Sequence, residues 1–398
     1  MASEEEYNGQ AFEETPFGSY SSQPARRLMA SHGVPRAATR EQRTVEARKK
    51  ELQEIEQYRS LVTDIQDGVN KKDFSPELLE KTSTLLRKNP EYYTIWNIRR
   101  RIFANELDSL SAQVESQQLA EDKKYSQVLD IIHLDLQFLF PLLLQYPKCY
   151  WIWNHRVWLL QQATIHLPSE KARSLWEDEL KLVGKMLTRD SRNFHGWGYR
   201  RTVIDSLEST SLSGRSMARD EYDYTTKMIG QNLSNFSAWH NRSRLILRIL
   251  NEEHASAEER KQMLDEEIKL IQKALFDPYD QSLWFYHQSL MSTFDPETAA
   301  ASMAPELSND DRLGYVKAEQ EFIEDLLEDA EDSKWVYQAL MECALIEARL
   351  TGGLSADVRT KIRGWLVKLK ELDPLRSGRW ADTEQVLLKD TAFREQSS

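Results

Sequence analysis

The sequence is poor in cysteine, and this scarcity narrows the kinds of site that the chain can build. Cys149 and Cys343 are the two cysteines in 398 residues, too few for a disulfide framework or a cysteine zinc motif. A reducing, cytoplasmic location is therefore expected. No glycine-rich phosphate loop, Ser/His/Asp arrangement or metal-ligand cluster is visible, so we expect no metal site in this chain. Cys149 is expected to be a small buried residue rather than a nucleophile.

Long apolar runs are also missing. The longest one, residues 131–144, is interrupted by His133, Asp135, Gln137 and Pro141 and falls short of the roughly 20 residues that cross a bilayer. It predicts a buried helix rather than a transmembrane segment. The N-terminal segment MASEEEYNGQ lacks the apolar stretch of a secretory signal.

An excess of positive charge is missing as well, because the net charge is -12. Proteins that bind nucleic acid neutralise phosphates with a basic face, so no nucleic-acid partner is expected. A protein partner with basic patches fits this charge better.

A repeat centred on tryptophan dominates what is present. Five segments follow one pattern, and two weaker copies follow toward the C-terminus. The five segments are NPEYYTIWNIRR (89–100), YPKCYWIWNHRV (146–157), DSRNFHGWGYRR (190–201), NLSNFSAWHNRS (232–243) and DPYDQSLWFYHQ (277–288). The tryptophan anchors of all seven copies are Trp96, Trp153, Trp197, Trp239, Trp284, Trp335 and Trp380. Successive anchors lie 42 to 57 residues apart, which is enough for two helices and two turns.

The residues ahead of each tryptophan predict where a helix begins. An Asn or Asp stands seven residues earlier in most copies, and Pro follows directly in four. Such a pair is typical of a helix start, because the cap accepts an orphan N–H and Pro has none. Each tryptophan is thus predicted in the second turn of a new helix. The seven positions are Asn89, Tyr146, Asp190, Asn232, Asp277, Glu328 and Asp373.

Amphipathic stretches with a helical period precede these starts, for example residues 75–88, 175–189 and 264–276. The unit is therefore a helical hairpin. The predicted fold is all-α, a helical-hairpin superhelix that forms a crescent-shaped solenoid with a concave face for a partner. One repeat array replaces the two or three domains that length alone suggests.

The predicted domain boundaries follow the repeat. Residues 1–38 are expected to be a disordered N-terminal extension, residues 39–385 a helical-repeat domain of about seven hairpins, and residues 386–398 a C-terminal tail. A long charged helix is predicted over residues 39–66, and a loop rich in Ala, Ser and Pro over residues 292–311.

A basic residue follows each of the five clear tryptophans by three positions. This spacing places both side chains on one helix face, where the cation can lie on the indole or cap a neighbouring repeat. Packing between repeats is the expected role, and His155 and His240 are also expected to be packing groups. The five residues are Arg99, Arg156, Arg200, Arg242 and His287.

Two copies differ from the rest at the corner before the tryptophan helix. Five positions before the tryptophan, Lys148 in the second copy and Arg192 in the third are the only cations. Two positions before it, only the third copy has a histidine, His195. We expect these three side chains to share a patch at helix N-termini, where free N–H groups and the helix dipole favour phosphate. A diphosphate or other anion site and a pair of solvated surface cations both stay open as interpretations.

The W-x-x-R units, preceded by N-P or D-P and by an aromatic residue three before the tryptophan, resemble the α-subunit repeats of protein prenyltransferases. The aromatic residues are Tyr93, Tyr150, Phe194 and Phe236. The resemblance covers roughly residues 40–385. It implies hairpins wrapped around a β subunit whose α/α barrel holds zinc and most of the isoprenoid pocket. Such enzymes transfer a farnesyl or geranylgeranyl group from its diphosphate to a protein cysteine.

The resemblance also implies roles for single residues. Lys148, in P-K-x-Y, matches the family lysine that contacts the departing diphosphate, and is the expected catalytic residue. Tyr150 matches a nearby tyrosine, and His195 a histidine on the diphosphate side, with Arg192 expected in the same patch. Phe194, also expected on the diphosphate side, stands where the farnesyl and type I members have Tyr, so one phosphate hydrogen bond of those members is expected to be missing.

The next position in the motif bears on substrate choice. Trp151 replaces a Gln that, in the farnesyl and type I members, reads the substrate's terminal carboxylate. Its loss argues against recognition of a short C-terminal box. The N-terminal segments SHGVPR and EARKKELQEIEQY are similar to the Rab geranylgeranyl transferase branch. There the α subunit acts only with a β subunit, on Rab GTPases that an escort protein presents, with geranylgeranyl diphosphate as donor.

Two other interpretations stay open. One is the shared α subunit of farnesyl and type I geranylgeranyl transferases, and the other is a non-catalytic helical-repeat scaffold of RNA-processing or trafficking complexes. Zinc is expected in the β subunit, with His32 as a residue that visits it. Met29 is a possible second translation start beside Met1.

Overall fold

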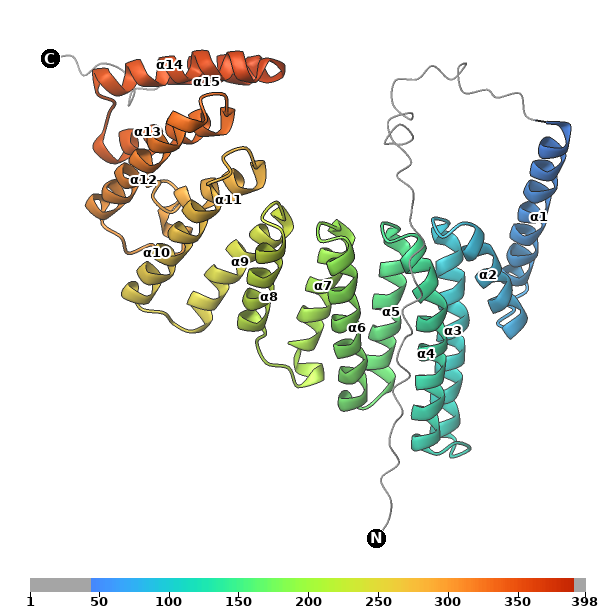
Figure 1. Ribbon diagram of the computed structural model, residues 1–398. Coiled ribbons are helices and arrows are strands. Elements are labelled where there is room, and N and C mark those ends of the chain that lie inside the picture. The colour runs from blue at the N-terminus through green and yellow to red at the C-terminus, as the bar shows by residue number, and fades with distance from the viewer. Residues whose placement is uncertain (1–43, 390–398) are drawn as a thin grey trace, which may run out of the picture. The chain divides into compact units, whose positions relative to one another are not determined.

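The computed structural model describes residues 44–389 (Figure 1). This range holds fifteen α-helices and three short 3-10 helices and no strand, so the all-α prediction is confirmed. The α-helices are α1 (Val45–Asn70), α2 (Pro76–Lys88), α3 (Tyr93–Glu115), α4 (Glu121–Gln145), α5 (Tyr150–His166), α6 (Ser169–Arg189), α7 (Phe194–Leu207), α8 (Ala218–Gln231), α9 (Phe236–Glu252), α10 (Ala257–Ala274), α11 (Gln281–Met291), α12 (Asn309–Asp329), α13 (Lys334–Thr351), α14 (Ala356–Leu372) and α15 (Ser377–Lys389). The 3-10 helices are η2 (Thr210–Leu212), η3 (Ala299–Ala301) and η4 (Pro374–Arg376).

The chain divides into two units between Lys71 and Lys72. The described part of the first unit is α1, a single helix capped by Thr44, whose hydroxyl accepts from the backbone N–H of Ala47 at 3.2 Å. The second unit contains α2 to α15, seven consecutive hairpins from α2/α3 to α14/α15. Within it, the second helices of neighbouring hairpins contact each other, as α3 contacts α5 and α5 contacts α7. The predicted solenoid of hairpins is confirmed.

The tryptophan helices start later than predicted. In the five clear copies the N-cap lies four residues before the tryptophan: the Asn193 side chain accepts from the N–H groups of His195 and Gly196, and that of Asn235 from Ala238. The position seven before the tryptophan, such as Asn89, ends the preceding helix instead. Where Pro follows, as at Asn89, the residue before it is kept out of the helical region, which explains the end there. Asp190 and Asn232 end their helices without a following Pro. Each tryptophan therefore lies in the first turn, not the second.

The tryptophans confirm their role as repeat anchors. All five clear ones are buried, and each indole Nε1 donates to the carbonyl six residues earlier, as Trp96 does to Pro90 at 2.8 Å. The same bond recurs in the next four copies at 2.8 to 2.9 Å. Each tryptophan thereby fixes its corner to the helix that follows.

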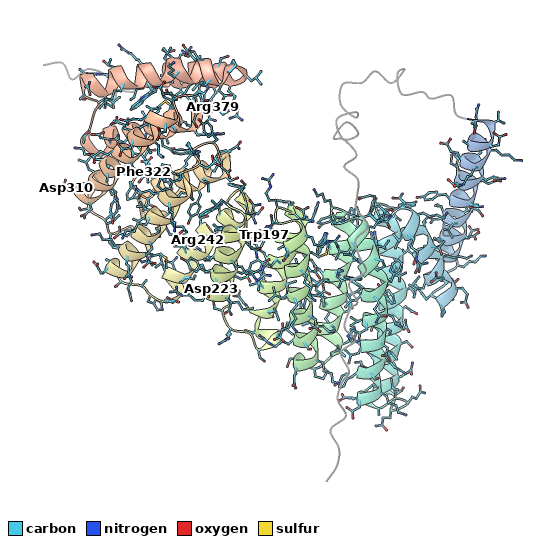
Figure 2. All side chains as sticks on the ribbon, in the orientation of Figure 1. Trp197, Asp223, Arg242, Asp310, Phe322 and Arg379 are labelled. Carbon is cyan, nitrogen blue, oxygen red and sulfur yellow. The ribbon has the colours of Figure 1, made fainter. Side chains whose placement is uncertain are left out.

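Neighbouring hairpins are joined by buried carboxylates that the sequence analysis did not single out. Each lies on the first helix of a hairpin and accepts from the basic residue three after the preceding hairpin's tryptophan. Figure 2 labels two members of this packing, Trp197 and Arg242, among the helices of the second unit. The pairs are Arg99–Asp135, Arg156–Glu179, Arg200–Glu221, Arg242–Glu267 and His287–Glu319, joined through Nε or Nε2 at 2.8 to 3.0 Å.

Three of these carboxylates also bind a ring on the following helix. His155 Nε2 lies 2.8 Å from Asp135, and the hydroxyls of Tyr199 and Tyr286 donate to Glu179 and Glu267 at 2.5 Å. Burial lowers the pKa of His155, although Asp135 opposes the shift. The packing role predicted for the five basic residues is confirmed, with a carboxylate rather than the indole as the main partner.

Helix α4 corrects the prediction for residues 131–144. The helix is 25 residues long and is the single described helix long and apolar enough to cross a membrane. Ile132, Leu139 and Leu143 are buried, but the side chain of Leu134 is 67% exposed, so the run is only partly buried. The buried pair between Asp135 and Arg99 of α3 places α4 in the hairpin stack.

The boundaries of several predicted segments differ from those in the structure. The long charged helix is α1, which begins six residues later and ends four residues later than predicted. The predicted loop after α11 contains η3 and ends at Ser308, the N-cap of α12. α15 extends to Lys389, into the predicted tail. The extension 1–38, Met29 and His32 lie outside the described residues.

Candidate functional site

The second corner, between α4 and α5, positions Lys148. Its side chain is 74% exposed, and Nζ lies 3.6 Å from Asp190 Oδ2, at the end of α6. The lysine thus reaches toward the third corner, between α6 and α7. An exposed pair of this kind contributes little to stability, at most about 1 kcal/mol, so the ammonium is readily available to another anion.

The N-termini of the two helices at these corners differ. Asn193 occupies the first-turn N–H groups of α7, accepting from His195 at 3.0 Å and Gly196 at 3.2 Å. Cys149 occupies the N-cap position of α5, but its side chain makes no cap hydrogen bond there, and its Sγ donates instead to the backbone oxygen of Pro90 at 3.5 Å. The first-turn N–H groups of α5 therefore have no side-chain cap, and the helix dipole adds to their preference for an anion.

Tyr150 and His195 face each other across the two corners. Their ring centroids are 6.3 Å apart, and Phe194 packs edge-on against His195 at 5.8 Å. The Tyr150 hydroxyl accepts a hydrogen bond from Asn154 Nδ2 at 3.4 Å, and Arg100 donates to Asn154 Oδ1 at 2.7 Å. Because the tyrosine oxygen accepts from Asn154, its own proton can be donated to a bound anion.

Arg100 and Asn154 are site residues that the sequence analysis missed. Arg100 comes four positions after Trp96 and Asn154 one position after Trp153, a signal that the repeat alignment contains. Burial lowers the pKa of Arg100 from its usual value, yet a guanidinium titrates so high that it keeps its charge at neutral pH.

Arg192 does not join this group. Its Nη1 donates to the backbone oxygen of Ser234 at 3.4 Å, at the next corner, between α8 and α9. There it lines a groove of about 550 Å³ with Phe236 and Asp280. The structure therefore brings together Lys148, Tyr150, Phe194 and His195, and leaves Arg192 one corner away.

Trp151 extends the site toward the first corner. Its ring centroid lies 5.3 Å from that of Tyr93, at the start of α3, and 5.2 Å from that of Tyr150. The surface beside Lys148 is therefore an aromatic platform. Trp151 presents an indole at this surface, and an indole lacks the side-chain amide with which a Gln can bind a carboxylate.

Neither cysteine is positioned for chemistry. Both are buried, and burial raises the pKa of the Cys149 thiol to about 11. A thiol with that pKa is protonated at neutral pH and is a poor nucleophile. Residues 44–389 contain no group of three or more His, Cys, Asp or Glu side chains that can hold a metal ion.

The repeats match a known family. The model of the protein prenyltransferase alpha subunit repeat matches residues 75–106, 132–163, 176–207 and 218–249, which correspond to the first four hairpins. The second and third matches contain Lys148, Tyr150 and His195.

Whole-chain relatives identify the branch. The geranylgeranyl transferase type-2 subunit alpha of Schizosaccharomyces pombe is 34% identical over 369 residues, which cover 89% of this chain and 98% of the relative. The subunit of the same name from Dictyostelium discoideum is 34% identical, over 78% of this chain and 88% of the relative. This chain belongs to the geranylgeranyl transferase type-2 α subunits. The human member is 32% identical over 67% of this chain and 43% of its own length.

The fold has a solved counterpart among the prenyltransferases. A chain of Candida albicans protein geranylgeranyltransferase-I, solved with GGPP, matches 83% of this chain and 90% of its own length, with a TM-score of 0.54 and 19% identity. At that identity the match shows the shared fold alone. Membership of the type-2 α subunits favours the interpretation as the α subunit of a Rab geranylgeranyl transferase. It disfavours the shared α subunit of the farnesyl and type I enzymes and the non-catalytic scaffold.

Proposed function

We propose that this type-2 α subunit forms a heterodimer with a prenyltransferase β subunit and is active only in that complex. The complex transfers geranylgeranyl from geranylgeranyl diphosphate to C-terminal cysteines of Rab GTPases, which an escort protein presents. The observation that carries the proposal is the uncapped N-terminus of α5, with Lys148, Tyr150 and His195 beside it, in a chain of this family. A cytoplasmic location belongs to the same proposal.

The chemistry assigned to this chain is stabilisation of the leaving group. Charge grows on the diphosphate as its C–O bond breaks, and a positioned ammonium stabilises that charge more in the transition state than in the ground state. Lys148 supplies the ammonium, and the Tyr150 hydroxyl, oriented by Asn154, supplies a hydrogen-bond donor. His195 lies beside the tyrosine and can contribute a further N–H.

Zinc is assigned to the β subunit. Its role when bound is to hold the acceptor cysteine as a thiolate. The described residues of this chain offer no ligand set that fits it. We also propose that His32 can reach that zinc ion.

Substrate choice follows from the aromatic platform. Trp151, stacked against Tyr93, offers no amide to a C-terminal carboxylate. We infer that the acceptor protein is recognised elsewhere, with an escort protein presenting it.

A reconstitution experiment tests this function. The chain is co-expressed with the β subunit from the same source, and transfer of labelled geranylgeranyl is measured on a Rab GTPase with and without its escort protein. We expect transfer that needs both β subunit and escort, and little transfer to a short peptide with a C-terminal box. Efficient escort-independent prenylation of that peptide would support the type I interpretation instead, and absence of any β-subunit complex would support the scaffold.

A further inference from the structure

The loop between α11 and α12, residues 292–308, is pinned from three helices. Arg349 of α13 pairs with Asp295 at 2.7 Å. Arg260 of α10 donates to the backbone oxygen of Met303 at 3.1 Å, and Arg312 of α12 to that of Pro305 at 2.9 Å. These contacts hold the loop against the neighbouring helices.

A cavity of about 260 Å³ lies between this loop and helices α9 and α11. Its volume is below the roughly 300–1,000 Å³ of small-molecule pockets, and suits a single side chain. Apolar side chains line part of it: Ile246, Leu247, Leu290 and Met303. Arg244 also lines the cavity, together with serine and threonine residues of α9, α11 and the loop.

Arg244 differs from the other arginines of its helix. Arg242 pairs with Glu267, and Arg248 with Glu208 and Glu252. Arg244 is exposed and has no carboxylate partner within the described part of the chain. Its guanidinium is thus available at the edge of the cavity.

Two more basic groups lie within electrostatic range of Arg244. Burial, and then Arg244, lower the pKa of Arg201, whose Nη1 donates to Asn241 Oδ1 at 3.1 Å. Burial, then Arg244 and Arg201, lower the pKa of His240, which stacks on Phe236. Asp205 is the carboxylate that acts on Arg201. Arg244 and Arg201 face the single carboxylate of Asp205, and a lowered pKa leaves His240 with less positive charge. The two arginines therefore outnumber the carboxylate on the surface of α7 and α9 beside the cavity, although the chain as a whole is acidic.

We propose that this cavity is a docking site for an acidic segment of a partner protein. One apolar side chain of the segment enters the cavity, and carboxylates that flank it pair with Arg244 and Arg201. Charge complementarity favours an acidic segment, because a bound carboxylate reduces the repulsion between the neighbouring arginines. The apolar lining selects the side chain, and an arginine beside a pocket is typical of the residues that dominate interface energies. The site is separate from Lys148, and the proposal does not rest on prenyl transfer.

The test measures peptide binding to the full chain by fluorescence anisotropy. The probe is a labelled peptide in which Leu is flanked on both sides by Asp and Glu. We expect binding that weakens with salt, and that Arg244→Ser weakens by about tenfold, the value of one charge-assisted pair. Ala301→Trp, at the exposed residue of η3 that lines the cavity, should weaken it as much by filling the space.

The matched control is Arg101→Ser, which removes an exposed arginine five positions after Trp96, as Arg244 is after Trp239. We expect it to leave binding unchanged. Equal binding to a peptide with Ser in place of Leu, or to Ala301→Trp, would overturn the proposal in favour of diffuse charge attraction. Displacement by inorganic phosphate with no need for Leu would make this a small-anion site, and no binding at all would also overturn the proposal.

Discussion

At the residue scale, the second and third corners are linked by one side chain, Asn193. Its Oδ1 caps α7, and its Nδ2 donates to the backbone oxygen of Pro147 at 3.0 Å, immediately before Lys148. Asn235 caps α9 in the same way, but its Nδ2 has no hydrogen-bond partner. Asn193 therefore joins two corners as well as capping a helix, whereas Asn235 only caps a helix.

This difference predicts how two matched substitutions behave. Asn193→Ala and Asn235→Ala each remove a helix cap and should each cost about 1 kcal/mol of stability. Only Asn193→Ala also removes one of the two donors to the Pro147 carbonyl beside Lys148, the other being Trp153 Nε1. Only this change should therefore lower kcat of the assembled enzyme. Thermal unfolding and steady-state kinetics of the two variants check this. Equal kcat values for the two would remove the positioning role from Asn193.

At the element scale, the hairpins are held together by buried ion pairs rather than by the tryptophans alone. Glu267 of α10 is 1% exposed and accepts from Arg242, Tyr222 and Tyr286. Charged groups in such a place are stable only while each has its partner. Each carboxylate therefore makes the stacking of one hairpin depend on the hairpin before it.

Removing one carboxylate charge tests this dependence. Glu267→Gln keeps the shape but leaves the Arg242 guanidinium buried without its anion, so we expect a loss of about 3–5 kcal/mol. Glu253→Gln removes a carboxylate from the exposed pair with Arg219 and should cost less than about 1 kcal/mol. Urea unfolding of both variants provides the comparison. A loss from Glu267→Gln no larger than that from Glu253→Gln would show that the pair does not join the hairpins.

At the scale of the whole molecule, the repeat was predictable because tryptophan is rare and recurs at regular steps. The helix starts were not, because Asn89 before Pro90 is as compatible with a helix end as with a cap. The role of the buried carboxylates was not predicted, because Asp135 and Glu179 look in sequence like any acidic residue on an amphipathic helix. Arg192 was misplaced because the repeat alignment specifies a corner position and not the direction in which a long side chain extends.

Lys148 is proposed to stabilise the departing diphosphate, and the kinetics of one variant test this role most directly. Lys148→Ala is prepared in complex with the β subunit, and assembly is confirmed by size-exclusion chromatography beside Arg192→Ala, the cation one corner away. We expect kcat of Lys148→Ala to fall by roughly 10² to 10³, as when one oxyanion donor is removed, and kcat of Arg192→Ala to stay near that of the unaltered enzyme. An unchanged kcat for Lys148→Ala in an intact complex would contradict the account.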